Sequence, residues 1–92
     1  MNKIFIHPRV TIKHPNLTEE DILHAFENYE VCRQRLDKEA YECLGFGFDT
    51  KGRMIEFVAM RDNEGDWLIY HALTPLSENA KRELGLERIN YE

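Results

Sequence analysis

The amino-acid sequence predicts an α+β fold, in which an antiparallel β-meander of three to four strands carries one main helix and a short C-terminal helix. Three segments in the second half of the chain have the character of strands, and only short turn-forming stretches separate them. A helix with a clear start signal precedes these strands, and a second helical pattern follows them. Short connections of this kind join antiparallel neighbours, because a parallel pair needs a long crossover.

The first sixteen residues are expected to form an extended segment, with a short strand at residues 3–6. His7 and His14 each precede a proline, whose ring disfavours the α-helical conformation for the residue before it. The main helix should begin next to Thr18, a good N-cap, because Asp21 follows three residues later as in a capping box. The apolar side of this helix is expected to comprise Ile22, Leu23, Phe26 and Tyr29. His24 points away from that side and should be exposed.

The strands of the meander are expected from residue 42 onward, after an ambiguous stretch at residues 31–41. Within that stretch, residues 31–36 favour a strand, and residues 38–41 favour a turn or a helical fragment. The segments 42–49, 53–61 and 67–74 are rich in strand-forming residues and are bounded by turn signals. Gly45 and Gly47 leave one side of the first of these strands without side chains, which predicts the close approach of another element.

A C-terminal helix is expected after the last strand. Thr74 suits its N-cap, Pro75 its first helical position and Gly85 its end. Its apolar face is expected to comprise Leu76, Ala80 and Leu84. The chain of 92 residues is therefore expected to be a single domain, with a core at about residues 13–84 and a tail at residues 85–92.

Composition and charge narrow the class of protein. The chain is 42% hydrophobic and 32% charged, which is typical of a globular domain and not of a disordered one. It has no apolar run of about 18 residues and no signal-peptide pattern, so a cytoplasmic location is expected. Cys32 and Cys43 lack the spacing of a metal-binding pair, so we expect reduced thiols, no metal and no cofactor. The net charge of −5 argues mildly against nonspecific nucleic-acid binding.

Four short motifs occur in an order and spacing that resemble a known family. They are the basic-histidine segment at residues 13–14, the helix start at residues 17–22, the glycine-led strand at residues 52–56 and the Ile-Tyr-His-Ala segment at residues 69–72. In this arrangement the chain resembles the BrnT toxins, within the broader RelE/ParE toxin-like group. The resemblance implies the toxin of a type II toxin–antitoxin pair, an endoribonuclease that acts on mRNA and is neutralised by a DNA-binding antitoxin.

Histidine, arginine and glutamate are the residues that would carry this chemistry. RNA cleavage without a metal needs a base for the 2′-OH, an acid for the leaving 5′-oxygen and a cation for the phosphorane. Histidine suits the first two roles and arginine the third. The candidate catalytic residues are His71, His24, Arg53 and Glu56. We expect His71 to act as the acid or the base, Arg53 to bind the phosphate, and Glu56 to orient a histidine.

Each of these candidates also has a structural interpretation, which the sequence leaves open. His71 would be a hydrogen-bonded core histidine on the strand face that also carries Trp67, Ile69 and Leu73. Glu56 lies in an apolar strand, where an unpaired carboxylate is costly. Its partner would be Arg53, Arg61 or a histidine on a neighbouring strand. Arg53 is equally well placed to pair with Asp49, and His24 would be a solvated helix residue.

Four further residues are candidates for substrate binding, namely His14, Lys13, Arg33 and Lys51. Arg9 and Arg35 would extend the same basic surface, although solvated edge-strand residues would give the same pattern. The alternative to a nuclease is a non-catalytic protein-interaction module on the same scaffold, which the acidic net charge favours. The expected partners are a cognate antitoxin and RNA. A homodimer is left open, and no association with a membrane is expected.

Overall fold

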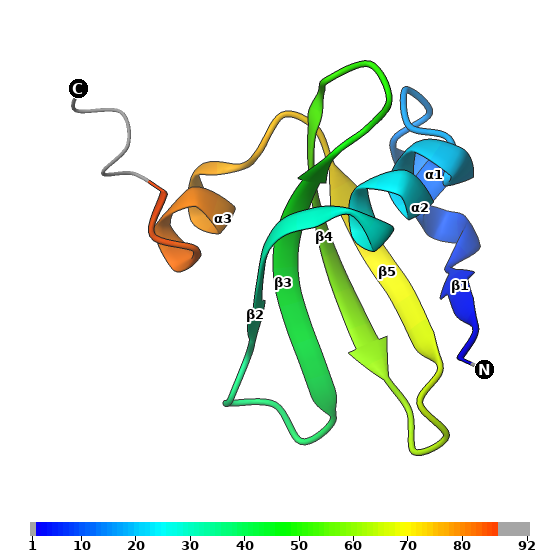
Figure 1. Ribbon diagram of the computed structural model, residues 1–92, viewed down its shortest axis with the longest axis vertical. Helices are drawn as coiled ribbons and strands as arrows, with labels where there is room; N and C mark the ends of the chain where they lie inside the picture. Colours follow the sequence, from blue (N-terminus) through cyan, green and yellow to red (C-terminus); the bar gives the residue numbers. More distant parts are fainter. Residues whose placement is uncertain (1, 87–92) are drawn as a thin grey trace.

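Residues 2–86 are described by the computed structural model, and they form a mixed β-sheet with helices on both faces (Figure 1). This arrangement confirms the α+β class. The predicted tail falls mostly outside the described residues, at residues 87–92. The elements in chain order are β1 (Ile4–Ile6), α1 (Pro8–Lys13), α2 (Glu19–Glu27), β2 (Tyr29–Gln34), β3 (Tyr41–Phe48), β4 (Met54–Arg61), β5 (Trp67–Leu73) and α3 (Glu78–Glu83).

The strands lie in the order β1-β5-β4-β3-β2. Strands β2 to β5 form the antiparallel meander that the sequence predicts. Strand β1 pairs with β5 in parallel, which was not predicted, and the long stretch of chain between them supplies the crossover that parallel pairing requires. The described sheet is therefore five-stranded and mixed, rather than an antiparallel sheet of three to four strands.

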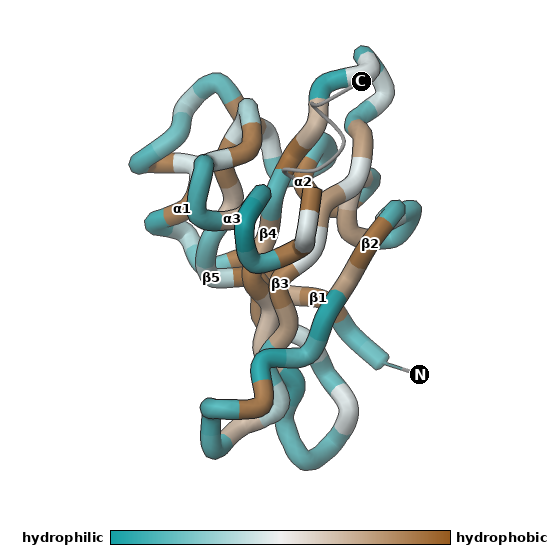
Figure 2. Tube along the Cα trace, turned by 90° about the vertical axis from the view of Figure 1, so that its left-hand side faces the viewer, coloured by the Kyte–Doolittle hydropathy of each residue, from teal (hydrophilic) through white to brown (hydrophobic). Residues whose placement is uncertain are grey.

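Each face of the sheet has its own hydrophobic core. We call the face covered by α1 and α2 the α2 face, and the opposite face, covered by α3, the α3 face (Figure 1). In Figure 2 the hydrophobic residues concentrate along the strands, and the loops are mainly hydrophilic. The α2-face core comprises Val10, Leu17, Ile22, Ala25, Cys43, Ile55, Phe57, Ala59, Ile69 and Ala72. The α3-face core comprises Leu44, Phe46, Val58, Leu76, Ala80 and Leu84.

The N-terminal segment is folded rather than extended, because a strand and a helix occupy it. His7 has extended backbone angles and is the N-cap of α1, where its side chain accepts a hydrogen bond from the backbone N–H of Arg9. Pro8 then takes the first helical position, for which its fixed φ is suited. The His-Pro pair therefore begins a helix instead of preventing one. Val10 of this helix is buried, so the core starts before the predicted residue 13.

Helix α2 begins where the sequence predicts. The side chain of Thr18 accepts a hydrogen bond from the backbone of Asp21, whose carboxylate accepts one from the backbone of Thr18 in return. The helix ends at Glu27, earlier than expected, so Tyr29 begins β2 and is exposed instead of joining the helical apolar face. Residues 37–40 form turns and bends, which excludes the alternative of a helical fragment there.

Gly47 of β3 allows α2 to approach the sheet closely, in agreement with the predicted close approach of another element. A Cβ atom on Gly47 would collide with the backbone of Ala25 in α2. A Cβ atom on Gly45 would instead meet neighbouring strands, at 2.5 Å from the carbonyl oxygen of Val31 in β2 and 2.8 Å from the ring of Phe57 in β4. Cys32 and Cys43 are free thiols. No helix among the described residues is long and apolar enough to cross a membrane.

Helix α3 begins three residues later than its predicted N-cap would place it. The hydroxyl of Thr74 donates a hydrogen bond to the carbonyl of Met54 at 2.6 Å, so it does not cap the helix. Ser77 caps α3 instead, by accepting a hydrogen bond from the backbone of Ala80. The three residues of the expected apolar face are buried together, although Leu76 precedes the helix and Leu84 follows its last residue.

Candidate active site

Glu56 on β4 and His71 on β5 face each other across the α3 face of the sheet. The Nε2 atom of His71 lies 2.7 Å from Oε2 of Glu56. The second oxygen of Glu56 accepts a hydrogen bond from the backbone N–H of Ser77, also at 2.7 Å. The carboxylate is buried, with both oxygens occupied, and its partner is the histidine of a neighbouring strand, one of the three partners expected from the sequence.

A β-bulge in β5 determines where His71 points. A register shift against β4 makes Tyr70 an additional residue on β5. Ile69 and Ala72 consequently both belong to the α2-face core, whereas Tyr70 packs against the α3-face core and His71 pairs with Glu56 there. The expectation that His71 shares a face with Trp67 and Ile69 is therefore wrong, because strict alternation does not continue through the bulge.

The pairing determines the protonation of both side chains. Burial alone would raise the pKa of Glu56, but the hydrogen bonds from His71 and Ser77 outweigh burial and hold the pKa below its ordinary value of 4.5. Glu56 is therefore ionised at neutral pH, and an ionised carboxylate can only accept hydrogen bonds. The proton in the bond belongs to Nε2 of His71. In neutral His71, Nδ1 is then left without a proton and can act as a base.

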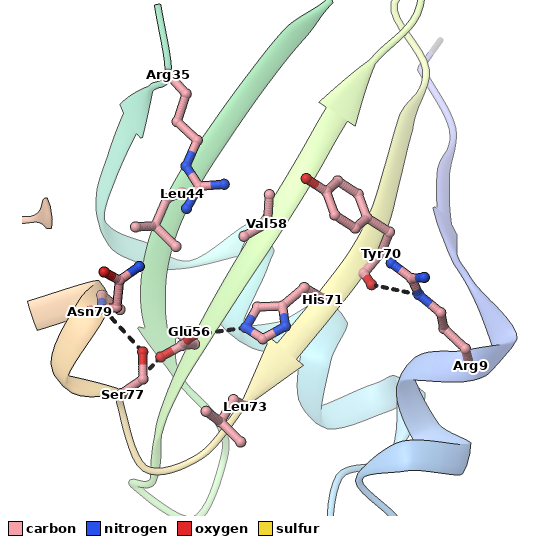
Figure 3. Close-up of a pocket in the computed structure, with 11 residues that line it drawn as sticks. Arg9, Arg35, Leu44, Glu56, Val58, Tyr70, His71, Leu73, Ser77 and Asn79 are labelled. Atoms are coloured by element: carbon pink, nitrogen blue, oxygen red, sulfur yellow. Dashed lines mark hydrogen bonds and ion pairs between the residues drawn. The ribbon is translucent and has the colours of Figure 1, made fainter. Parts of the chain in front are cut away.

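Two cavities meet at His71, whose side chain is 36% exposed. The larger has a volume of about 350 Å³ and reaches toward α3 (Figure 3). Its lining includes Arg35, Leu44, Glu56, Val58, Ser77 and Asn79. The smaller has a volume of about 160 Å³ and includes Lys13 and His14 at the end of α1. Arg9, Tyr70 and His71 line both cavities, so the two form one continuous site around the histidine.

Helix α1 supplies the cations of this site. Nε of Arg9 donates a hydrogen bond to the carbonyl of Tyr70 at 3.3 Å, and its guanidinium lies 5.7 Å from the centre of the Tyr70 ring. Figure 3 shows the His71 ring between Glu56 and Arg9. Among the described residues, no acidic side chain lines the smaller cavity, which holds Arg9, Lys13 and two histidines. The site is therefore locally basic in an acidic protein.

Arg35 in the larger cavity ties α3 to the sheet. It contacts Glu83 of α3 through Nε at 2.8 Å and Glu42 of β3 through a second nitrogen at 2.8 Å. The hydrogen bond to Glu83 raises the pKa of Arg35 against the opposing effect of burial, and Glu42 adds to the increase. Arg35 is thus a fixed, paired cation that holds one wall of the cavity in place.

Arg53 and Lys51 lie elsewhere, at the β3–β4 turn beside the start of α2. Nε of Arg53 contacts Asp49 at 2.7 Å, and another nitrogen contacts Asp21 at 3.2 Å. A third nitrogen donates to the carbonyl of Asn16 at 3.1 Å. The structural interpretation of Arg53, pairing with Asp49, is therefore confirmed, and its guanidinium joins the turn to α2. Lys51 is exposed in the same turn.

His24 and Arg33 are also separate from the site. Nδ1 of His24 lies 2.9 Å from the carbonyl of Phe48, so this histidine is half-buried on the α2 face rather than freely exposed. Arg33 is exposed on the edge strand β2 and is not among the residues that line the cavities beside His71. Of the four catalytic candidates, Glu56 and His71 therefore lie together on the α3 face, whereas His24 and Arg53 lie on the α2 face.

Neither Tyr70 nor Arg9 was among the catalytic and substrate-binding candidates drawn from the sequence. The bulge that turns Tyr70 toward the α3 face has no sequence signal. Arg9 was considered for a basic surface, and its place in α1 was hidden by the assignment of an extended segment. The signal that could have placed it is Pro8 as a first helical residue, followed by four residues and the basic Lys13.

A cluster of acidic residues lies in the β4–β5 loop. Asp62, Glu64 and Asp66 bring one carboxylate oxygen each within 4.8 Å of one another. Asp62 accepts hydrogen bonds from the backbone N–H groups of Glu64 and Asp66, which accounts for its position as a turn residue. The cluster therefore has a structural explanation in the hairpin.

Comparison of the chain with protein-family models, curated proteins and solved structures found no match. The interpretation of the site consequently rests on the residues of this chain. What they define is a buried glutamate that orients a half-exposed histidine, next to a second histidine and two cations.

Proposed function

We propose that the cavity beside His71 cleaves RNA without a metal ion, and that the chain is the toxin of a type II toxin–antitoxin pair. One observation carries the first part: His71 shares a cavity with His14, Lys13 and Arg9, while Glu56 holds its Nε2 atom. The second part rests on the order and spacing of the four toxin-like motifs in the sequence.

The proposed reaction uses the two histidines as base and acid. Nδ1 of His71 takes the proton of a ribose 2′-OH while that oxygen attacks the neighbouring phosphorus. His14, carrying a proton, donates it to the leaving 5′-oxygen, so the products are a 2′,3′-cyclic phosphate and a 5′-hydroxyl. Arg9 and Lys13 stabilise the charge on the phosphorane. Because DNA lacks the 2′-OH, RNA is the substrate class.

Two roles differ from those expected from the sequence alone. Arg9 takes the phosphate role in place of Arg53, whose nitrogens are committed to Asp49, Asp21 and Asn16. His14 takes the second histidine role in place of His24, which lies on the other face. Glu56 keeps the orienting role, because it bonds His71 and not the reacting atoms.

A DNA oligonucleotide with a single ribonucleotide tests the cleavage. In the presence of EDTA, the purified protein should cut it once, next to the ribonucleotide, and leave an all-DNA control intact. His71→Ala should abolish this cut, and His24→Ala, a matched histidine variant on the opposite face, should retain it. Absence of cleavage by the folded wild-type protein contradicts the proposal, as does a wild-type rate in the His71→Ala protein.

Induced expression in a bacterial host tests the toxin assignment separately. Wild-type protein in the cytoplasm should stop growth and deplete bulk mRNA, and His71→Ala should do neither at the same protein level. Co-expression of the product of the neighbouring reading frame should restore growth if that product is the antitoxin. Normal growth with intact mRNA, at a high level of soluble wild-type protein, contradicts the toxin assignment.

A further inference from the structure

A second region of the molecule has the features of a binding surface, and it lies beyond the RNA-cleaving proposal. It is a cavity of about 540 Å³ beside the β2–β3 and β4–β5 loops. These two loops lie at the bottom of Figure 1. This volume is within the range of binding pockets for small ligands and side chains. The apolar and aromatic residues that line it are Phe5, Tyr41, Met60, Trp67 and Leu68. We call this cavity the aromatic groove.

The groove contains an apolar row that crosses three strands. Phe5 of β1 is in register with Leu68 of β5, and Leu68 is in register with Met60 of β4. Phe5 is 52% exposed and Leu68 is 36% exposed. The described part of α3 packs farther along the sheet, on Leu44, Phe46 and Val58, so this row has no helix above it. Exposed apolar side chains that are aligned across neighbouring strands form a surface that another chain can bind.

Tyr41, Trp67 and Arg61 border the groove from the other face of the sheet, because Trp67 alternates with Leu68 along β5 and packs edge-on against Phe26 of α2. Tyr41, itself 43% exposed, packs edge-on against Trp67 with their rings 5.7 Å apart. The guanidinium of Arg61 lies 5.5 Å from the centre of the Trp67 ring. These three side chains contact one another on the α2 face, so the surface left open to a partner is the row formed by Phe5, Leu68 and Met60.

The rim of the groove is acidic. Glu39, Asp62 and Asp66 line it, against a single basic residue, Arg61, which is engaged with Trp67. Asp62 and Asp66 each use one carboxylate oxygen to accept backbone N–H groups. Among the described residues their other oxygens have no hydrogen-bond partner, so negative charge remains available at the edge of an apolar surface.

We propose that the aromatic groove binds a short segment of another protein that presents an aromatic or branched aliphatic side chain next to lysine or arginine. The apolar row accepts the anchor, and the carboxylates of the rim attract the flanking cation. A symmetric dimer of this chain is disfavoured at the same place, because it would bring two acidic rims together. The proposal is independent of RNA cleavage, since it uses no residue of the His71 cavities.

A display library of random dodecapeptides tests the groove. Peptides are selected on the wild-type protein, and the enriched peptide is titrated into ¹⁵N-labelled protein while amide signals are followed. The expected consensus pairs an aromatic or aliphatic residue with lysine or arginine, and the signals that move should include Met60 and Leu68. Phe5→Ala should weaken binding at least about tenfold, as loss of a central anchor does. Phe48→Ala, the same change at an exposed position at the other end of β3, should leave binding unchanged.

Charge variants complete the test. Asp62→Asn with Glu39→Gln should weaken binding, and added salt should weaken wild-type binding more than that of the double variant. The proposal is overturned if no enriched peptide binds the groove, if the consensus lacks basic residues, or if Phe5→Ala and Phe48→Ala behave alike. It is also overturned if sedimentation shows a dimer that Phe5→Ala converts to monomer, because the groove would then be a self-interface.

Discussion

Each face of the sheet carries a buried carboxylate that is paired with a basic side chain, Asp49 with Arg53 and Glu56 with His71. The two pairs differ in how many of their hydrogen-bonding groups lack a partner within the protein. On the α2 face, Asp49 is fully buried and accepts three hydrogen bonds, and Arg53 directs its remaining nitrogens to Asp21 and Asn16. On the α3 face, Glu56 is also fully used, but it occupies only one ring nitrogen of His71.

The comparison shows what separates a structural pair from a candidate site. In the Asp49–Arg53 pair, the hydrogen-bonding groups contact other parts of the chain and join the β3–β4 turn to α2. In the Glu56–His71 pair, one nitrogen is left over and the histidine lines two cavities. A residual donor or acceptor at an accessible place can reach a substrate, whereas a completed network contributes to stability. Substitutions in the two pairs and on the two faces of the sheet test this distinction.

Asp49→Ala should cause the largest loss of stability, about 3–5 kcal/mol, because removing one partner of a buried pair leaves the other partner's groups unpaired. Since domains of this kind are stable by only about 5–15 kcal/mol, the variant should be close to unfolding. Urea denaturation measures the change. Asp37→Ala, the same substitution in an exposed loop, should stay within about 0.5 kcal/mol of wild type. Equal effects of the two substitutions would contradict the structural role of Asp49.

Glu56→Gln should lower stability by about 1.5–3 kcal/mol at neutral pH, because it removes hydrogen bonds to a charged group. The pKa of Glu56 is lowered in the folded protein, so its contribution is present above the ordinary value of 4.5 and is lost as the pH falls through the folded value. The gap between wild type and variant should therefore shrink below pH 4.5 in urea denaturation series. A gap that stays constant to low pH would show that Glu56 is not held ionised by its partners.

Gly47→Ala should cost about 1–3 kcal/mol, because the added methyl group collides with the backbone of α2 and a backbone segment must move. Thermal denaturation followed by circular dichroism measures the effect. Ala80→Gly, on the α3 face, is a counterpart that removes a methyl group instead of adding one. An unchanged melting temperature for Gly47→Ala would show that the α2 face is not closely packed.

The helix caps should give the smallest effects. Thr18→Ala should cost about 1 kcal/mol, because it breaks a reciprocal capping box on the helix that covers the larger core. Ser77→Ala should cost less, because the six-residue helix α3 is short enough to open locally without unfolding the sheet. Hydrogen exchange should report faster opening of α3 alone in that variant. A larger loss of global stability in Ser77→Ala than in Thr18→Ala would contradict the expectation that the α2 face contributes more to stability than the α3 face.

The parts of the fold that local signals determine were predicted correctly. Thr18 and Asp21 mark the start of α2, and the bare glycine side of β3 indicated the close approach of another element, which at Gly47 is α2. The parallel pairing of β1 with β5 was missed, because it depends on residues that are far apart in the chain. Helix α1 was missed because a residue before proline usually indicates extended structure, and here that residue is an N-cap.

The candidate site was predicted in part, for a related reason. Glu56 and His71 were identified because a carboxylate and a histidine in apolar strands each need a partner. Whether they shared a face depended on the bulge at Tyr70, for which a single sequence carries no signal. The sequence alone does not distinguish Arg53 from a phosphate-binding arginine. Only the positions of Asp49 and Asp21 show that its nitrogens are already paired within the protein.

The most direct test of the account compares one variant from each pair in a single cleavage assay. The rates of His71→Ala and Arg53→Lys on the single-ribonucleotide substrate are measured at a temperature where circular dichroism shows that both are folded. The account predicts that His71→Ala loses about a hundredfold or more, while Arg53→Lys stays within about threefold of wild type. A lost cut in Arg53→Lys, with the cut retained in His71→Ala, would contradict it.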